Sequence, residues 1–276
     1  MKKVIILYNP LSGSGNGKTE AEKLSGRGTL IDITKITSYE DFFASLNDED
    51  EIIIAGGDGT VSRFANDTYN IDIKNPIYYY PTGTGNDFAT DLGMKKGDEP
   101  VRIDEYIKNL PVAEINGKSY RFMNGIGYGI DGYACEMGDK LREKGKKINY
   151  ISIVIKGILY AFKPRKAHVT VDGKEYEFKR VWFAPTMKGR YYGGGINMTP
   201  SQGRKGDKVS VAVIHKAFNF VLLPILPTAF KGEHVKYKKF VAIMEGKDIT
   251  VKFDMPTSLQ VDGETILDVE EYSVKA

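Results

Sequence analysis

Apolar and polar positions alternate along the first part of the chain in a rhythm that predicts strands separated by helices. Continuous apolar runs, typical of strands buried on both faces, occupy residues 3–8, 30–33, 51–55 and 77–80. Helical patterns fill the intervals at residues 18–24, 38–46 and 60–69, and Ser38 is placed to cap the second of them. This order predicts an α/β domain built on a parallel sheet with helices on both faces.

The pattern changes near residue 111. A hairpin is predicted at residues 112–124, because Asn116-Gly117 separates two short strand patterns. Two helical stretches follow, and the remainder alternates as short strands do, at residues 167–171, 175–183, 208–215, 241–243 and 248–253. The helical stretches lie at residues 134–140 and 150–162. The second half is therefore expected to be a mostly antiparallel β-sandwich.

These patterns set the expected domain boundaries. We place the first, α/β domain at residues 1–115 and the second, β-rich domain at residues 116–266. Whether the last residues, about 267–276, return to the first domain is left open by the pattern.

Composition narrows the class of protein. The chain has 276 residues and one cysteine, which excludes an intrachain disulfide framework and a four-cysteine zinc site. Glycine is in excess, at 30 residues of 276, or about 11 % against roughly 7 % in average proteins. The net charge of +3 divides unevenly, since residues 1–118 carry 13 basic and 19 acidic side chains and residues 119–276 carry 26 and 17. A basic second half is compatible with scattered surface charge or with a face that meets anionic lipid or phosphate.

Neither a targeting segment nor a membrane span is predicted. The four apolar residues after Lys3 are too few for the core of a signal peptide and fit a buried first strand better. The longest apolar stretch, residues 217–230, contains two prolines and is shorter than the ~20 residues that span a bilayer. We therefore expect a cytoplasmic protein. Residues 218–230 are expected either to form a core helix or lid, or to dip into lipid.

Much of the glycine excess lies in three turns, each of which follows a predicted strand. Their sequences are NPLSGSGNGKT at residues 9–19, GGDGT at 56–60 and PTGTGNDFA at 81–89. Because ligands bind outside the carboxyl ends of strands in a parallel α/β sheet, the turns are expected to converge on one edge. Small residues there let backbone N–H groups approach a phosphate, although Ser12 stands where a Walker A motif needs glycine. Asp58 is placed to meet a magnesium–phosphate complex, and Asn86 or Asp87 to cap the next helix.

In this order, the three motifs resemble the catalytic domain of the diacylglycerol kinase family, which includes bacterial soluble lipid kinases and the sphingosine and ceramide kinases. GGDGT alone is shared with NAD kinases, whereas the other two motifs favour lipid kinases. The second half continues the resemblance at residues 124–131 (NGIGYGID), 191–195 (YYGGG), 200–209 (PSQGRKGDKV), 231–234 (KGEH) and 261–264 (VDGE). The resemblance covers essentially the whole chain.

The resemblance implies phosphoryl transfer with ATP and Mg²⁺ as cofactors. It makes Glu264 the general base and Asp262 its support, while Asp58 orients the magnesium–ATP complex or, as in related sphingosine kinases, acts as the base. The implied nucleotide site comprises Asn9, Pro10, Leu11, Ser12, Gly13, Thr34, Gly56, Gly57, Asp58, Gly59, Thr60, Val61, Ser62, Gly83, Thr84, Gly85, Asn86 and Asp87.

Some bacterial members of the family carry a second, structural magnesium, and the resemblance implies residues for it here. The carboxylate of Asp207 and the carbonyls of Arg204 and Val209 would hold that ion. Lys208 stands where the family has glycine, and its ammonium group would compete for the Asp207 carboxylate.

The leading hypothesis is an ATP-dependent lipid kinase that phosphorylates the hydroxyl of a lipid alcohol, foremost diacylglycerol to give phosphatidic acid. The implied partners are ATP and a lipid alcohol at the anionic inner face of the membrane. No nucleic-acid partner is expected, and a homodimer formed through an exposed β edge stays open. Two alternatives also stay open: a soluble kinase of NAD-kinase type, and a nucleotide-binding regulator without transfer activity.

Overall fold

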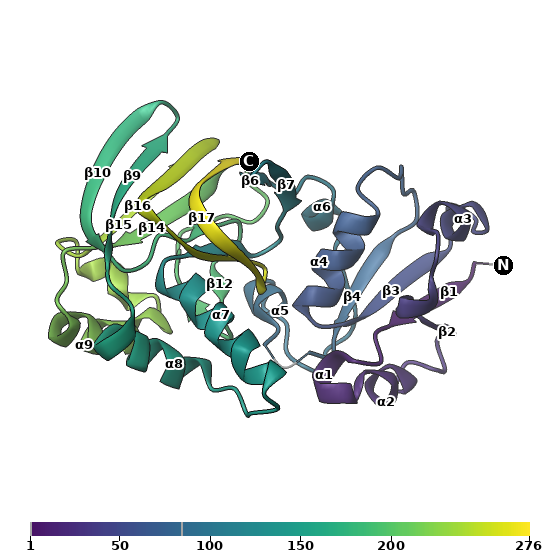
Figure 1. Ribbon diagram of the computed structural model, residues 1–276. Coiled ribbons are helices and arrows are strands. Elements are labelled where there is room, and N and C mark those ends of the chain that lie inside the picture. The colour runs from purple at the N-terminus through teal and green to yellow at the C-terminus, as the bar shows by residue number, and fades with distance from the viewer. Residues whose placement is uncertain (1, 84) are drawn as a thin grey trace. The chain divides into compact units, whose positions relative to one another are not determined.

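The computed structural model of the protein describes residues 2–83 and 85–276. The chain divides into two compact units, Met1–Asn109 and Leu110–Ala276, coloured purple to blue and teal to yellow in Figure 1. The division falls shortly before the boundary expected at residues 115 and 116. Each unit is described below by itself.

The first unit is a mixed sheet with helices between its strands. Its strands, in the spatial order β2-β1-β3-β4-β5, are β1 (Val4–Tyr8), β2 (Thr29–Asp32), β3 (Glu51–Gly56), β4 (Ile77–Pro81) and β5 (Val101–Arg102). Strands β1 to β4 pair in parallel, as the apolar runs predicted, whereas β5 pairs antiparallel with β4 and was not predicted. The helical segments are α1 (Ser12–Gly15), α2 (Gly17–Glu22), η1 (Ile33–Lys35), α3 (Tyr39–Ala44), α4 (Asp58–Asp67), α5 (Asp87–Asp91) and α6 (Asp104–Ile107).

Burial explains why the strand patterns of this unit were legible. The run Ile52, Ile53 and Ile54 in the central strand β3 is at most 5 % exposed. Ile6, Ile53 and Tyr80 pack in one apolar cluster with residues of the α2 region. The predicted cap is also present, since the Ser38 hydroxyl accepts a hydrogen bond from the backbone N–H of Asp41 at the start of α3.

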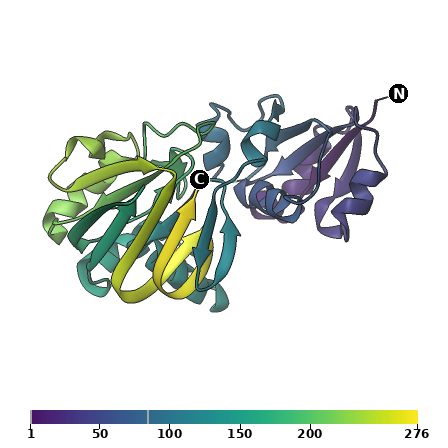
Figure 2. The same cartoon turned by 90° about the horizontal axis from the view of Figure 1, so that it is seen from above.

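The second unit is a mostly antiparallel sheet, whose strands lie side by side in Figure 2. Its main path runs β15-β14-β11-β8-β16-β17-β6-β7, and the ribbon of β9 and β10 joins it through β16. The strands are β6 (Val112–Ile115), β7 (Lys118–Arg121), β8 (Gly125–Tyr128), β9 (Arg165–Val171), β10 (Lys174–Val181), β11 (Thr186–Met187), β14 (Val209–Ile214), β15 (Val241–Gly246), β16 (Asp248–Val261) and β17 (Glu264–Lys275). A separate small ribbon pairs β12 (Tyr191–Tyr192) with β13 (Ile196–Asn197).

Two features of this sheet bear on the expectations. The hairpin of β6 and β7 turns at Asn116 and Gly117, both at positive φ, as the Asn-Gly signal predicted. The last strand, β17, pairs with β16 and β6 in the sheet of the second unit. The pattern had left open a return of these residues to the first unit.

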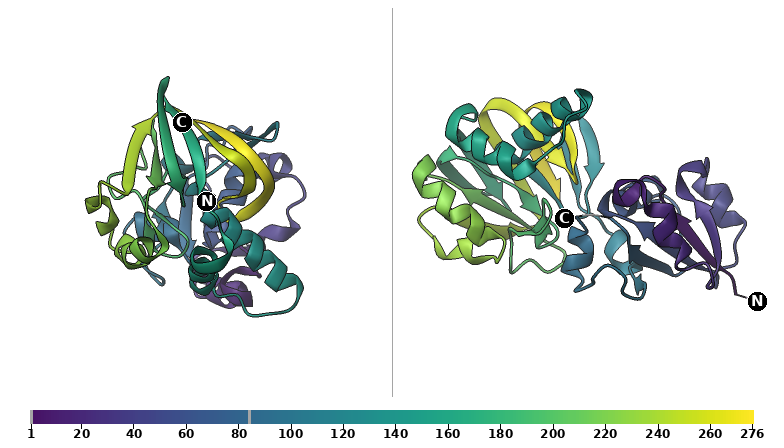
Figure 3. Two further views of the ribbon diagram at one scale, coloured as in Figure 1. Left: turned by 60° about the vertical axis from the view of Figure 1, so that its left-hand side comes forward. Right: turned by 90° about the horizontal axis from the view of Figure 1, so that it is seen from below.

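Helices of the second unit pack beside this sheet. They are α7 (Ile130–Glu143), α8 (Tyr150–Lys156), the π-helical turn η2 (Gly157–Ala161), α9 (Asn219–Ala229) and the short η3 (Glu233–Lys236). Segments α8, η2 and α9 lie side by side in Figure 1 and Figure 3, and the Asn219 side chain donates a hydrogen bond of 2.7 Å to the carbonyl of Ile158. In the part of the chain that the structure describes, no helix combines the length and the apolar character needed to cross a membrane.

Candidate active site

The three glycine-rich turns of the first unit meet at the carboxyl edge of its sheet. The Asn9 side chain donates a 3.0 Å hydrogen bond to the hydroxyl of Thr60, which joins the first turn to the second. The hydroxyls of Ser12 and Thr82 lie 2.9 Å apart, which joins the first turn to the third. The backbone N–H of Thr82 donates to the Gly56 carbonyl at 2.8 Å. The predicted convergence of the turns is therefore present, and polar side chains hold it together.

Close backbone contact explains why these turns are built from glycine. A Cβ atom on Gly83 would lie 2.6 Å from the Cα of Gly57, and one on Gly13 would lie 2.6 Å from the Thr82 carbonyl oxygen. Gly13 also has φ +58°, a conformation that side chains disfavour. The loops can approach each other, and present backbone N–H groups at this edge, because these positions lack side chains.

Asp58 ties the second turn to the third. It opens α4, and its carboxylate accepts a hydrogen bond of 2.6 Å from the N–H of Asp87 and contacts of 3.3 Å from the N–H of Phe88. Asn86 stands at the N-cap position of α5, as expected, but its side chain makes no capping hydrogen bond, and the first N–H groups of α5 donate to Asp58 of a different helix. Asn86 instead adopts φ 45°, and its amide donates to the Gly83 carbonyl at 2.8 Å.

Two side-chain polar atoms near Asp58 and the third turn are buried without a hydrogen-bond partner among the described residues: the Tyr79 hydroxyl and the Oδ1 atom of Asn86. Burial, together with the nearby charge of Asp58, raises the pKa of Tyr79 well above its ordinary value. The Tyr79 hydroxyl is therefore neutral at physiological pH. Sequence reasoning missed this tyrosine because it lies inside an apolar strand pattern.

The remaining predicted nucleotide residues differ in what they can offer. Leu11 and Gly59 are exposed, whereas the Val61 side chain is fully buried and could serve a ligand only through its backbone. Thr34 lies in η1, where its hydroxyl donates to Asp32 at 2.7 Å. Thr84 lies outside the described residues.

In the second unit, Asp262 lies in the tight turn between β16 and β17, and Glu264 is the first residue of β17. Val261 pairs with Glu264 across the turn, whose two central residues, Asp262 and Gly263, have φ +46° and +97°. This is the geometry of a primed hairpin turn, in which an Asp-Gly pair is favoured. Glu264 is exposed at the start of β17.

Asp262 locks this turn onto the segment that enters β8. Its carboxylate accepts hydrogen bonds from the backbone N–H groups of Met123, Asn124 and Gly125 at 2.6, 2.9 and 3.0 Å. The N–H of Asp262 donates to the Gly125 carbonyl at 3.0 Å. These bonds fix the turn that leads into Glu264, and a supporting role of Asp262 in catalysis stays a prediction.

Arg204 reaches the same segment with its side chain. Its guanidinium donates to the Met123 carbonyl at 2.7 Å and to the Asn124 side-chain oxygen at 2.9 Å. The resemblance had assigned Arg204 only a backbone carbonyl for a metal ion. No sequence signal identified the guanidinium contacts, because they join residues that are 80 and 81 positions apart.

The carboxylate that the resemblance assigns to a second magnesium ion has a lysine partner in the structure. The Asp207 carboxylate is paired with the ammonium group of Lys247 at 2.5 Å, and this pair lowers the pKa of Asp207. The competitor is therefore Lys247, whereas Lys208 had been expected. Within residues 2–83 and 85–276, no three His, Cys, Asp or Glu side chains gather closely enough to hold a metal ion.

A further acid, Asp131, was not singled out by sequence reasoning. It lies in the first turn of α7, and its carboxylate accepts a 2.7 Å hydrogen bond from the hydroxyl of Tyr192, which belongs to the YYGGG segment. Burial raises the pKa of Asp131 to about 7, and the bond from Tyr192 offsets part of that effect.

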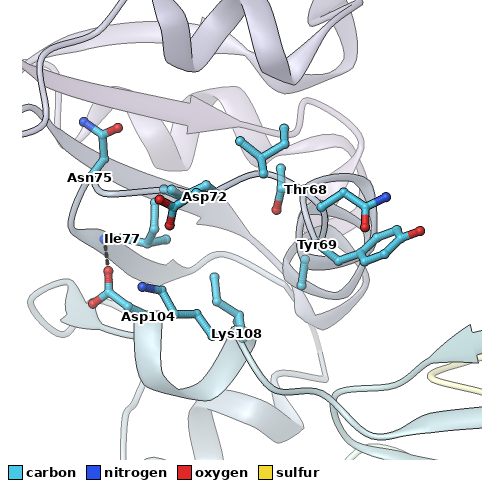
Figure 4. A pocket seen from close by; sticks show the side chains of 12 residues that line it. Thr68, Tyr69, Asp72, Asn75, Ile77, Asp104 and Lys108 are labelled. Carbon is cyan, nitrogen blue, oxygen red and sulfur yellow. Dashed lines mark hydrogen bonds between the residues drawn. The ribbon is translucent and has the colours of Figure 1, made fainter.

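One cavity of the first unit, of about 370 Å³, lies near the start of β4, whereas the glycine turns follow the ends of β1, β3 and β4. Figure 4 shows side chains that line this cavity. It is bounded by the end of α4, the start of β4 and helix α6. The Asp104 carboxylate at its wall accepts a 2.7 Å hydrogen bond from the N–H of Ile77, drawn as a dashed line in Figure 4. None of the predicted site residues lines this cavity.

Glycine turns gathered at the carboxyl edge of an α/β sheet are typical of proteins that bind phosphate groups. The sequence profile of the Diacylglycerol kinase catalytic domain matches residues 3–113, and that of the YegS C-terminal NAD kinase beta sandwich-like domain matches residues 124–272. The chain belongs to the diacylglycerol kinase-like family of lipid kinases.

Individual relatives agree with this membership. The chain is 26 % identical over 253 residues to a diacylglycerol kinase of Mycobacterium tuberculosis, which covers 85 % of this chain and 80 % of the relative. It is 25 % identical over 280 residues to a diacylglycerol kinase of Bacillus subtilis, covering 96 % and 90 %. A crystal structure of a diacylglycerol kinase from Bacillus anthracis superposes with a TM-score of 0.67 at 23 % identity, covering 99 % and 94 % of the two chains. This last likeness concerns the fold.

Proposed function

We propose that this protein transfers the γ-phosphate of ATP to the hydroxyl of a lipid alcohol, with diacylglycerol as acceptor and phosphatidic acid as product. The observation that carries the proposal is the joining of three glycine turns at one sheet edge through Asn9–Thr60, Ser12–Thr82 and Asp58. Membership of a lipid kinase family supports the choice of acceptor. A membrane surface is the environment in which such an acceptor is met.

The nucleotide is proposed to bind along these turns in the first unit. The N–H groups of glycine loops suit the β- and γ-phosphates, because no side chain separates them from the ligand. The donor chemistry also fits magnesium, which favours one or two carboxylates together with phosphate oxygens. Asp58 is the carboxylate that would hold the ion, and the ion would neutralise charge on the phosphates.

The acceptor hydroxyl is proposed to be activated by Glu264. The oxygen of the acceptor hydroxyl attacks the γ-phosphorus, and the bond from that phosphorus to the leaving ADP oxygen breaks. The hydroxyl proton passes to the Glu264 carboxylate. Exposure of Glu264 leaves its carboxylate open to a substrate. Asp262 positions Glu264 and does not itself take the proton, because its hydrogen bonds hold the turn from which Glu264 projects.

A phosphorylation assay with labelled ATP and magnesium tests the proposal. Diacylglycerol, a monoacylglycerol and a sphingosine-like base are presented in mixed micelles, and NAD is presented in solution. We expect labelled phosphatidic acid from the wild type. Glu264→Gln should lower kcat by about 10²- to 10⁴-fold, the usual contribution of a general base, with ATP affinity nearly unchanged.

The matched control is Glu270→Gln, which removes another exposed acid from the same strand, β17. It should retain wild-type kcat. Phosphorylation of NAD alone would contradict the lipid assignment. An unchanged rate for Glu264→Gln would remove Glu264 as the base, and ATP binding without turnover of any alcohol would identify a regulator.

A further inference from the structure

Glu264 follows a hairpin turn whose own hydrogen bond does not fix every backbone group. The bond that closes such a turn joins the residues on either side of it, here Val261 and Glu264. It leaves the N–H of the second central residue, Gly263, without a partner inside the turn. Gly263 is exposed and has φ +97°, so nothing but an outside acceptor would hold its peptide group in one orientation. A change in that orientation would move the Glu264 carboxylate.

The side chain of Gln260 supplies an acceptor for this N–H. Its Oε1 atom accepts a hydrogen bond of 2.6 Å from the N–H of Gly263, and the residue is only 6 % exposed. Because neighbours hold a buried side chain in one rotamer, this acceptor is fixed in a way that water would not be. The amide of Gln260 also lies against Gly127, where a Cβ atom would come within 2.6 Å of its Nε2 atom. The glycine of the NGIGYGID segment therefore makes room for the side chain that holds the VDGE turn.

A second contact holds the chain just after Glu264. The hydroxyl of Thr265 donates a 2.6 Å hydrogen bond to the Asp139 carboxylate in α7. The other oxygen of this carboxylate is paired with Arg142 of the same helix at 2.5 Å. Helix α7 packs against both β16 and β17. The residue before Glu264 is thus fixed by β16, and the residue after it is fixed by α7.

These contacts lie on the face of the hairpin that is opposite to the Glu264 side chain. Gln260 and Thr265 are cross-strand partners and share a face, whereas Glu264 pairs with Val261 on the other face. Ser258, two residues before Gln260, also reaches α7, because its hydroxyl donates to Glu136. Gln260 and Thr265 therefore lie behind the acid, where they act on the reaction through the position of Glu264.

We propose that Gln260 and Thr265 are positioning residues for Glu264, which fix the backbone on either side of it and so hold its carboxylate where it meets the acceptor hydroxyl. The inference rests on the proposed function, because it requires Glu264 to be the base. A displacement of about 1 Å can lower the rate of a reaction by about 10²-fold, so these two hydrogen bonds affect turnover although neither touches the substrate. Neither residue belongs to the sites that the sequence motifs predicted.

Steady-state kinetics with labelled ATP, magnesium and diacylglycerol in mixed micelles test the proposal. Gln260→Met keeps the length of the side chain but offers Gly263 only a weakly accepting sulfur. It should lower kcat by about 10- to 100-fold, with KM for both substrates changed by less than about threefold. Thr265→Val should lower kcat by about three- to tenfold, and Thr265→Ser, which keeps the hydroxyl, should retain the wild-type value.

The matched control is Ser258→Ala. It removes a hydrogen bond to α7 from a residue of the same strand that is 7 % exposed, nearly the same as Gln260. Because Ser258 does not touch the turn, this variant should keep the wild-type kcat. Trp182 fluorescence in urea checks that each variant is folded under assay conditions. If Gln260→Met does not fold, the pair Thr265→Val and Thr265→Ser carries the test.

A double-mutant cycle separates positioning from general damage to the fold. In the Glu264→Gln background no base remains to be positioned. Gln260→Met should therefore lower the residual rate of that background by less than about twofold, whereas damage to the fold would lower both rates by the same factor.

Hydrogen exchange of the Gly263 amide, followed by NMR, measures the first contact without any turnover. We expect this amide to exchange at least about tenfold faster in Gln260→Met than in the wild type. Ser258→Ala should leave its exchange rate unchanged.

Several results would overturn the positioning role. These are an unchanged kcat in Gln260→Met or Thr265→Val, the same fractional loss in the wild-type and Glu264→Gln backgrounds, a loss in Ser258→Ala as large as in Gln260→Met, or equal exchange of the Gly263 amide in Gln260→Met and the wild type. An unchanged rate for Glu264→Gln would remove the base together with the residues that position it. Failure of the kinase proposal looks different, because the wild type would then phosphorylate no lipid while its Gly263 amide stayed protected by Gln260.

Discussion

Replacing Asp262 with alanine should destabilise the second unit, because its carboxylate is the acceptor for three backbone N–H groups. The donors belong to Met123, Asn124 and Gly125, all of which are buried. An unsatisfied buried donor costs about 1–3 kcal/mol, and the half-exposed turn admits some water, so about 1 kcal/mol per bond is appropriate. Alanine also tolerates φ +46° less well than aspartate does, at roughly 1 kcal/mol. The expected loss is about 3–4 kcal/mol.

The single tryptophan provides the assay. Trp182 lies in the second unit, is 1 % exposed and donates a 2.9 Å hydrogen bond to the Ala217 carbonyl, so its fluorescence reports unfolding of that unit in urea. With a urea dependence of about 2 kcal/mol per molar, the midpoint should fall by about 1.5–2 M. Asp262→Asn retains an acceptor oxygen and a residue that tolerates positive φ, and it should lose about half as much.

Glu264→Ala is the matched control, because it alters an exposed acid at the edge of the same turn. The free energy of unfolding of this variant should stay within about 0.5 kcal/mol of the wild-type value. A midpoint for Asp262→Ala equal to that of the control would refute the reasoning. So would equal damage from Asp262→Asn and Asp262→Ala, because charge alone, rather than the number of acceptors, would then matter.

Three further outcomes are expected. Asp131 keeps its proton in the folded protein up to about pH 7, whereas the unfolded chain releases it near pH 4. The free energy of unfolding should therefore fall as the pH rises from about 4 to about 7. Asp131→Asn should remove this fall, which is measured by comparing urea midpoints at about pH 4.5 and about pH 8. Gly57→Ala should weaken ATP binding, because the added Cβ would lie 3.2 Å from the Cα of Gly83 and force the second and third turns apart. A Cβ added at Gly59 would meet open space, so Gly59→Ala should leave the folding of the first unit intact in thermal melting. Lys247→Ala should change stability by at most about 1 kcal/mol, and magnesium should raise the urea midpoint of this variant more than that of the wild type if the freed Asp207 can bind it.

The sequence predicted those parts of the fold that depend on local pattern. The apolar runs of β1, β3 and β4 are legible because both faces of these strands are buried, and the β6–β7 hairpin is legible because Asn116-Gly117 has a specific turn chemistry. Strand β5 has two exposed residues and carries no such pattern. The Asp58 cap of α5 and the Arg204 contacts join residues 29 to 81 positions apart, and the pairing of Asp207 with Lys247 likewise depends on how the chain folds back. No local pattern could indicate these long-range contacts.

Asp58 and Asp262 differ from Glu264 because backbone N–H groups donate hydrogen bonds to the carboxylates of both aspartates. Asp58 accepts hydrogen bonds from the N–H groups of Asp87 and Phe88, and Asp262 accepts them from residues 123–125. Each acid therefore joins its own glycine turn to a distant segment of the same unit. A general base needs a carboxylate lone pair directed at the substrate proton, and these hydrogen bonds reduce the number available on both aspartates. Glu264 is exposed and projects from a turn that Asp262 holds in place. This division between acids that fix the loops and an acid open to substrate is the reason that we favour Glu264 over Asp58 as the base.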